Sequence, residues 1–297
     1  MSGAQSIIDG GIVGGIVYLR QVMIRRSSNF CSRGALRRDV VVGRETRRRA
    51  PWLQCLALTF MTLSATAGTN LTVSGVAEFT MAYQAWDGTG FAKAANTFAK
   101  APDTSTNQYW RGTAEFHRVL FLLGEPTTTT NRQASAKALE SAVAALQRAI
   151  QLDPAHGESH ALLSTVYGLS IAANPARGLW LGKRVMDQEK LARKLNPDNP
   201  RVLYLAGMNR YHGPALLGGK DEGSKLLLAA EKLFEAEAGT PQAPVEPRWG
   251  RSTCLVYIGK PYDALGKPAE AEQYFRKARD LNPQDKLAQA ELEKRKK

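Results

Sequence analysis

The clearest hydrophobic pattern in the chain lies near its C-terminus, in the segment PAEAEQYFRKARDL over residues 268–281. With a period of 3.6 residues, Ala271, Phe275, Ala278 and Leu281 fall on one stripe, and polar or charged residues occupy most of the remaining surface. Proline is tolerated in the first turn of a helix, and the Asn-Pro pair after residue 281 disfavours helical geometry. The pattern therefore predicts an amphipathic helix over 268–281.

A second stripe precedes this helix, in the segment STCLVYIGKPYDAL over residues 252–265. Gly259 lies on this stripe, and Gly266 lies where two antiparallel helices must be joined. Gly259 and Ala271 are small enough to let the two helices approach closely, and large residues fill the space around them. Together the two stripes predict a helical hairpin. The large residues of the first helix are Leu255, Ile258 and Tyr262.

The same order of large, small and turn residues recurs upstream. Two more second helices end in LDP and LNP runs at Pro154 and Pro197, and a first helix follows each of these prolines. The pattern is weaker but persists over 91–101 and 107–123. We expect about four to five hairpins between Ser74 and Pro283, which is enough to bury a continuous core by stacking. Segments that interrupt the pattern are expected to lengthen the turns or to separate repeats, at 124–134, 170–180, 212–223 and 238–250.

The hairpin pattern resembles the tetratricopeptide repeat family, whose unit is about 34 residues long. The resemblance implies an all-α fold, a tetratricopeptide-like stack of antiparallel helical hairpins (an α-solenoid) with inserted loops. Similar irregular repeats occur in exported bacterial proteins of no assigned activity, so the resemblance implies architecture more than biochemistry. It is most complete in the last hairpin, at Leu255, Ile258, Gly259, Tyr262, Leu265, Gly266, Glu270, Ala271, Phe275, Ala278 and Pro283.

In this family the first helix of each hairpin lines a concave groove, and four of its positions point into that groove. Aromatic and Met side chains beside Arg201 suit an apolar or aromatic peptide segment. The alternative is that the same residues only pack on the inserted loops. The residues that the resemblance implies for partner binding are Arg111, Glu115, Arg118, Thr165, Arg201, Tyr204, Met208, Tyr211 and Lys260.

The predicted function is a non-enzymatic protein-interaction module that binds a protein or peptide partner and needs no cofactor. A small-ligand-binding component, in which the inserted loops close a pocket over the groove, is the alternative. A hydrolase with a site built from scattered residues is a third reading. A deep, loop-closed apolar cavity favours the ligand, and an open groove favours the peptide.

The N-terminal segment has the layout of a targeting sequence. An Arg cluster precedes an apolar run from Trp52 to Leu63 and the small residues Ala65-Thr66-Ala67, which is the three-part pattern of a secretory signal peptide. An apolar run of this length is too short to span a bilayer comfortably. The predicted divisions are a non-native or disordered leader over 1–40, a signal peptide over 41–67, a repeat domain over 68–283 and a charged C-terminal helix over 284–297.

The signal-peptide pattern predicts a protein that is exported, periplasmic or secreted, with no stable membrane span after cleavage, and the resemblance to exported bacterial repeat proteins implies a bacterial one. An organellar transit peptide and an uncut signal anchor are the rival interpretations of the same segment. Cys31 and Cys55 leave with the leader, so Cys254 alone remains and no internal disulfide is expected.

The formal net charge of +13 invites a nucleic-acid interpretation, but its distribution argues against one. Residues 1–67 hold ten arginines against three acidic residues, so this segment supplies +7 of the total. The remaining chain is only mildly basic and has no concentrated basic stripe. A hydrophobic content of 43% with 23% charged residues also excludes a disordered chain.

Candidate chemistry is sparse. His156 and His160 are four residues apart around Glu158, but His160 takes a position that packs inward in the other repeats, so a structural role is favoured over a metal site. His117 takes the place of Tyr262 in its own helix and is expected in the core. The segment GPALLGGK over 213–220 lacks the spacing of a phosphate-binding loop. No nucleophile elbow or pair of catalytic carboxylates is visible.

Overall fold

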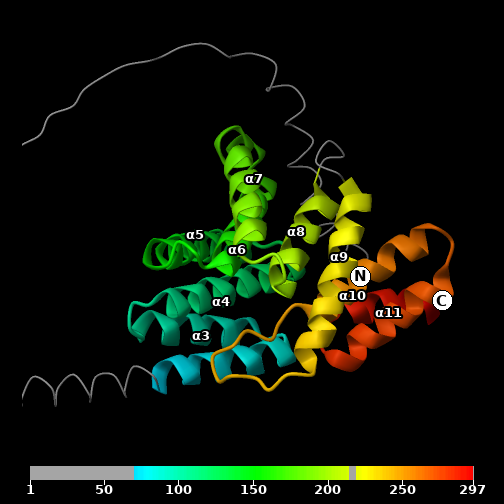
Figure 1. Ribbon diagram of the computed structural model, residues 1–297, viewed down its shortest axis with the longest axis horizontal. Helices are drawn as coiled ribbons and strands as arrows, with labels where there is room; N and C mark the ends of the chain where they lie inside the picture. The colour runs from blue at the N-terminus through cyan, green and yellow to red at the C-terminus, as the bar shows by residue number, and fades with distance from the viewer. Residues whose placement is uncertain (1–69, 214–218, 297) are drawn as a thin grey trace, which may run out of the picture.

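The computed structural model describes residues 70–213 and 219–296 and is built from helices throughout these ranges (Figure 1). The first described helix covers residues 70–85. The others are α3 (Gly88–Lys100), α4 (Ser105–Gly124), α5 (Thr129–Leu152), α6 (Gly157–Ala173), η2 (Pro175–Arg177), α7 (Gly178–Leu195), α8 (Pro200–His212), α9 (Gly219–Ala238), α10 (Arg251–Ala264), α11 (Pro268–Leu281), α12 (Lys286–Glu293) and η4 (Lys294–Lys296).

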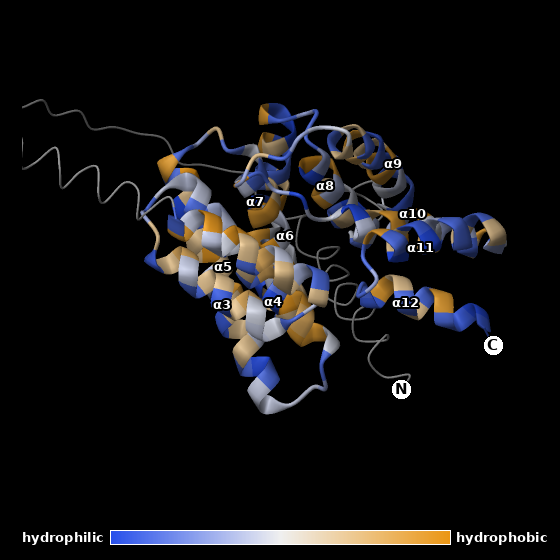
Figure 2. Ribbon diagram, turned by 90° about the horizontal axis from the view of Figure 1, so that it is seen from below, coloured by the Kyte–Doolittle hydropathy of each residue, from blue (hydrophilic) through white to orange (hydrophobic). Residues whose placement is uncertain are grey.

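The described helices pair into five antiparallel hairpins, which confirms the predicted all-α stack. Helix 70–85 contacts α3 through Gly75 against Phe98 and through Glu78, which meets Thr97 and Lys93. The following pairs are α4 with α5, α6 with α7, α8 with α9, and α10 with α11. In Figure 2 hydrophobic and hydrophilic residues alternate along the helices, as expected when each helix buries one face. One hydrophobic core runs from Val76 in the first helix to Ile258 in α10, and a smaller one lies between α10, α11 and α12.

Helix ends follow local sequence signals. The side chains of Thr104, Thr128 and Asn199 accept hydrogen bonds from the first turns of α4, α5 and α8, which satisfies amide groups that have no partner within the helix. Pro200 and Pro268 occupy first turns, where the missing N–H costs nothing. Polar caps and prolines therefore set where the repeats begin.

The last hairpin shows why small residues are needed between its helices. A Cβ atom on Gly259 would lie 2.6 Å from the Phe275 ring and 3.1 Å from the carbonyl oxygen of Ala271. Phe275 and Ala271 are fully buried. The close approach predicted from the sequence is therefore present, and Gly266 makes the connecting turn with a left-handed φ of 71°.

The first described helix lies against the last hairpin, so the stack closes on itself. The Tyr83 hydroxyl accepts a hydrogen bond from the Gly250 amide at 3.1 Å and lies 3.5 Å from the Ser252 hydroxyl. The Asn282 side-chain amide donates to the Tyr83 carbonyl at 3.5 Å. These contacts join residues that are 167 to 199 positions apart in the sequence.

Candidate functional site: the inner face and its strap

The first helices α4, α6 and α8 share one face of the stack, called the inner face here, and residues 239–250 cross it. We call this segment the strap. In Figure 1 it is the gold segment that leaves α9, extends toward the helices drawn in cyan and returns to α10. The indole N–H of Trp110 in α4 donates to the Val245 carbonyl at 3.0 Å. The strap therefore occupies the face on which the sequence predicts an open groove.

Trp249 anchors the C-terminal end of the strap. Its side chain is 2% exposed and lies among the rings of Phe116, His117 and Tyr204, with ring-centre distances of 5.0 to 6.4 Å. Its indole N–H donates to the Tyr109 hydroxyl at 3.2 Å. The strap end is thus held by both apolar burial and a satisfied polar group.

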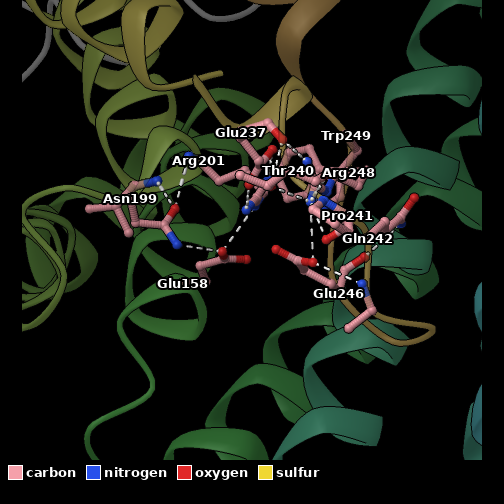
Figure 3. A network of polar contacts seen from close by, with 12 residues as sticks. Glu158, Asn199, Arg201, Glu237, Thr240, Pro241, Gln242, Glu246, Arg248 and Trp249 are labelled. Atoms are coloured by element: carbon pink, nitrogen blue, oxygen red, sulfur yellow. Dashed lines mark hydrogen bonds and ion pairs between the residues drawn. The ribbon is translucent and has the colours of Figure 1, made fainter. Parts of the chain in front are cut away.

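A buried ion network holds the N-terminal end of the strap (Figure 3). Arg201 is 3% exposed and donates from Nε to Glu158 at 2.9 Å, and from both terminal nitrogens to Glu237 at 2.6 and 2.9 Å. Asn199 donates to the first oxygen of Glu158 at 2.6 Å, and the Tyr109 hydroxyl donates to the second at 2.5 Å. The network ties α4, α6 and α8 to the end of α9.

The electrostatics of this network favour fixed charges. Burial alone raises the pKa of the Glu158 carboxyl, but the Arg201 charge and the hydrogen bonds from Tyr109 and Asn199 outweigh it and leave that pKa lowered. Burial and the neighbouring Glu158 raise the pKa of Tyr109 well above its usual value. Glu158 therefore stays ionised and Tyr109 stays neutral at neutral pH. The polar atoms of both side chains are hydrogen-bonded to neighbouring residues.

Arg248 supports the strap from within. Its guanidinium donates to the Glu237 carbonyl, to the Thr240 hydroxyl at 3.0 Å and to the Glu246 carboxylate at 3.3 Å. The Glu246 carboxylate also accepts from the Ala243 amide at 3.0 Å. These bonds fold the strap into a defined shape against the end of α9.

The expectation that Arg201, Tyr204 and Glu115 line an accessible groove is wrong. They are 3%, 5% and 8% exposed, because the ion network encloses Arg201, Trp249 lies against Tyr204, and Glu115 is enclosed within the core-facing part of α4. The sequence suggested residues 238–250 only as a separator between repeats. Tyr204 is thus covered by Trp249 and Gly250 of this segment.

Tyr211 and Lys260 are half-buried and engaged with neighbours. The Tyr211 ring packs edge-on against His212 and Tyr257 at 5.2 and 5.3 Å. The Lys260 ammonium lies 4.8 Å from the centre of the Tyr257 ring and 3.7 Å from the Glu291 carboxylate. Both side chains therefore contribute to contacts between the last repeats.

The remaining predicted site residues lie partly exposed, namely Arg111 and Arg118 on α4, Thr165 on α6 and Met208 on α8. Gly168 lies one turn beyond Thr165, and a Cβ atom there would meet no atom within 4 Å. Residues 165, 168 and 172 are the partly exposed stripe of an otherwise largely buried α6. The structure thus leaves an accessible strip on the inner face, centred on Gly168.

The two histidines of the HGESH segment serve helix α6. His156 accepts from the Ser159 amide through Nδ1 at 3.2 Å and caps the helix. The His160 ring nitrogens lie 2.6 Å from the Gln188 side-chain oxygen and 3.0 Å from the Pro154 carbonyl oxygen. Within residues 70–213 and 219–296 there is no group of three His, Cys, Asp or Glu placed to hold a metal ion.

The comparisons with known proteins identify the repeat. The fold defines a stack of helical hairpins, and residues 258–285, which run from α10 through α11, match the family model of the tetratricopeptide repeat. This segment is therefore a tetratricopeptide repeat, and proteins of that family generally serve as non-catalytic scaffolds for protein interactions. No curated protein matches the chain. In the described part of the chain, no helix has the length and apolar character that crossing a membrane requires.

Proposed function

We propose that the chain is a non-enzymatic scaffold of the bacterial cell envelope and binds a segment of a protein partner on the accessible strip of its inner face. The targeting pattern over 41–67, which lies outside the described residues, supports export. Arg111, Arg118, Thr165 and Met208 flank the strip around Gly168. The open space at Gly168 is the observation that carries the proposal.

The strap supports a peptide as the kind of partner. It is itself a non-helical segment held on the inner face by a Trp110 hydrogen bond to a main-chain carbonyl and by one buried aromatic anchor, Trp249. Main-chain hydrogen bonds combined with a few side-chain anchors are a common mode of peptide recognition. A partner segment binding beside the strap would use the same chemistry on neighbouring helices.

Filling the strip at Gly168 tests the proposal. The change Gly168→Trp introduces a bulky side chain where no atom lies within 4 Å, and replacing a helical glycine removes a cost of up to about 1 kcal/mol. The thermal midpoint should stay the same or rise. Capture of the partner from envelope extracts should fall at least tenfold, as measured by quantitative affinity purification.

Lys277→Trp is the matched control, because Lys277 is exposed on the second helix of the last hairpin, away from the inner face. It should leave the captured proteins unchanged. Equal capture by the parent and by Gly168→Trp would contradict the strip as the binding site. A protein that is absent from the envelope fraction would contradict the proposed location.

A further inference from the structure

A hollow on the opposite side of α6 is independent of the inner face. It lies between α5 and α7, has a volume of about 280 Å³ and is floored by Tyr167 and Ser170 of α6. At 100° per residue these two positions point away from Thr165 and Gly168. The walls include Val143 of α5 and Leu181 of α7. The hollow is therefore a separate surface feature, and its lining is mixed, with apolar residues from all three helices beside polar and charged ones.

Large apolar side chains stand exposed at the edge of this hollow. Trp180 lines it and is 55% exposed, and the adjacent Leu179 is 64% exposed. The other tryptophans in the described residues are less exposed. Trp86 is half-buried, and Trp110 and Trp249 are buried. A tryptophan beside an apolar hollow is typical of a binding surface, since this residue is enriched at interfaces.

Two arginines frame Trp180. Arg177 and Arg184 also line the hollow. Arg177 ends η2 and caps α7, and the spacing of 177, 180, 181 and 184 places these residues along one side of the first turns of α7. Within the described residues neither arginine forms an ion pair, whereas Arg201, Arg210 and Arg251 all meet carboxylates. One carboxylate, Glu140 of α5, also lines the hollow. The hollow thus combines an apolar centre with two arginines that have no carboxylate partner in the described residues and one acidic group.

We propose that this hollow binds an acidic peptide segment of a partner protein through one bulky apolar side chain and two carboxylates. The apolar side chain would pack against Trp180, and the carboxylates would accept paired hydrogen bonds from Arg177 and Arg184. Seven residues of helix span about 10 Å. In an extended peptide alternate side chains share a face, and four residues span about 13 Å, a difference that long arginine side chains can cover. The matching ligand therefore has two acidic residues four positions apart with an aromatic residue midway between them, all three on one face.

A labelled synthetic peptide tests this site. The probe is a capped eight-residue peptide with two glutamates four positions apart and a phenylalanine midway between them. Fluorescence anisotropy measures its binding to the purified mature protein. Saturable binding is expected. Trp180→Ala should weaken it at least tenfold, and a peptide with alanine in place of phenylalanine should lose affinity to a similar extent.

Reversing the charge of the two arginines tests whether they bind the carboxylates of the peptide. The double variant Arg177→Glu/Arg184→Glu should lose the glutamate peptide and gain affinity for a peptide with lysines in place of the glutamates. Lys190→Glu/Lys194→Glu makes the same change in net charge at exposed positions near the other end of α7, and it should bind the glutamate peptide within twofold of the parent. Thermal midpoints confirm that each variant is folded.

Several results would overturn the proposal. One is the absence of saturable binding to the parent protein. Another is a double variant that keeps the preference of the parent for the glutamate peptide. A third is Trp180-dependent binding to vesicles of anionic phospholipid without binding to the peptide, which would assign the exposed Trp180 and Leu179 to a membrane surface.

Discussion

His117 is a titratable residue that lies buried in the hydrophobic core. Its ring lies 5.0 to 5.6 Å from the rings of Phe79, Tyr83, Phe91 and Trp249, and its Nδ1 lies 2.9 Å from the Thr113 carbonyl oxygen. Burial lowers the pKa of His117 to about 4. The imidazole is therefore neutral at physiological pH and acts as a packed ring with one hydrogen bond.

The lowered pKa predicts a loss of stability in mild acid. In the unfolded chain His117 has a pKa of about 6.5, so between about pH 6.5 and 4 the unfolded state binds the extra proton. The stabilisation is complete above that window and is lost as the pH falls through it, by on the order of 3 kcal/mol. Urea unfolding at pH 7, 5.5 and 4.5 measures this slope.

His117→Phe isolates the contribution of this imidazole. Such a variant is needed because the carboxyl groups of a protein also titrate near the lower end of the window. The variant should unfold with a shallower dependence on pH than the parent. Parallel pH profiles for the two proteins would mean that His117 does not remain buried and neutral.

At the scale of elements, the sequence predicts the helices well and the strap poorly. Helices are set by local signals, namely the 3.6-residue period, the small residues such as Gly259 and the prolines after each second helix, so their existence and pairing follow from short stretches. Residues 239–250 have no period, and three prolines exclude regular structure there. Nothing local indicates that Trp249 packs against α4, which lies more than 120 residues earlier in the sequence.

The contrast between local signals and long-range contacts also explains which site residues are accessible. Inner-face positions follow from repeat geometry, and two of them, Thr165 and Met208, are partly exposed in the structure. Accessibility at Arg201 and Tyr204 depends on a segment from another part of the chain. The one local signal for this contact is the tryptophan at the end of a proline-rich insertion, because tryptophan side chains are largely buried on average.

Removal of the Trp249 side chain should reveal how much the strap stabilises the fold. Truncation of a buried aromatic residue costs about 3 to 5 kcal/mol, and Trp249→Ala also leaves the Tyr109 hydroxyl without its donor. We expect a large drop in the urea midpoint. Gln242→Ala, at an exposed position of the same strap, should change the stability by less than about 0.5 kcal/mol. Similar midpoints for the two variants would show that the strap is not an integral part of the core.

At the scale of the whole molecule, contacts between helix 70–85 and the last hairpin change how the stack responds to damage. In an open stack each repeat contacts only its neighbours, so a perturbation spreads along the sequence. Here Tyr83 meets Gly250, Ser252 and Asn282. The first and last hairpins are therefore neighbours in space.

Overpacking the last hairpin tests this coupling. Ala271→Leu inserts a larger side chain at a fully buried position beside Gly259, which typically costs about 1 to 3 kcal/mol. Hydrogen–deuterium exchange should accelerate in α10 and α11 and also in helix 70–85, with less change in α5. Lys277→Leu, on the exposed side of α11, should leave exchange in helix 70–85 unaltered. Acceleration confined to α11 in the Ala271 variant would contradict the coupling.

The contact of Tyr83 with residues 250–282 also limits how this gene can change in length. An array with free ends gains or loses a repeat by duplication or deletion and keeps every remaining interface. In this chain an extra hairpin between α7 and α8 would carry the last hairpin away from Tyr83 and withdraw Trp249 from α4. Homologues that conserve these contacts should therefore keep five hairpins and differ in length chiefly in the turns between helices.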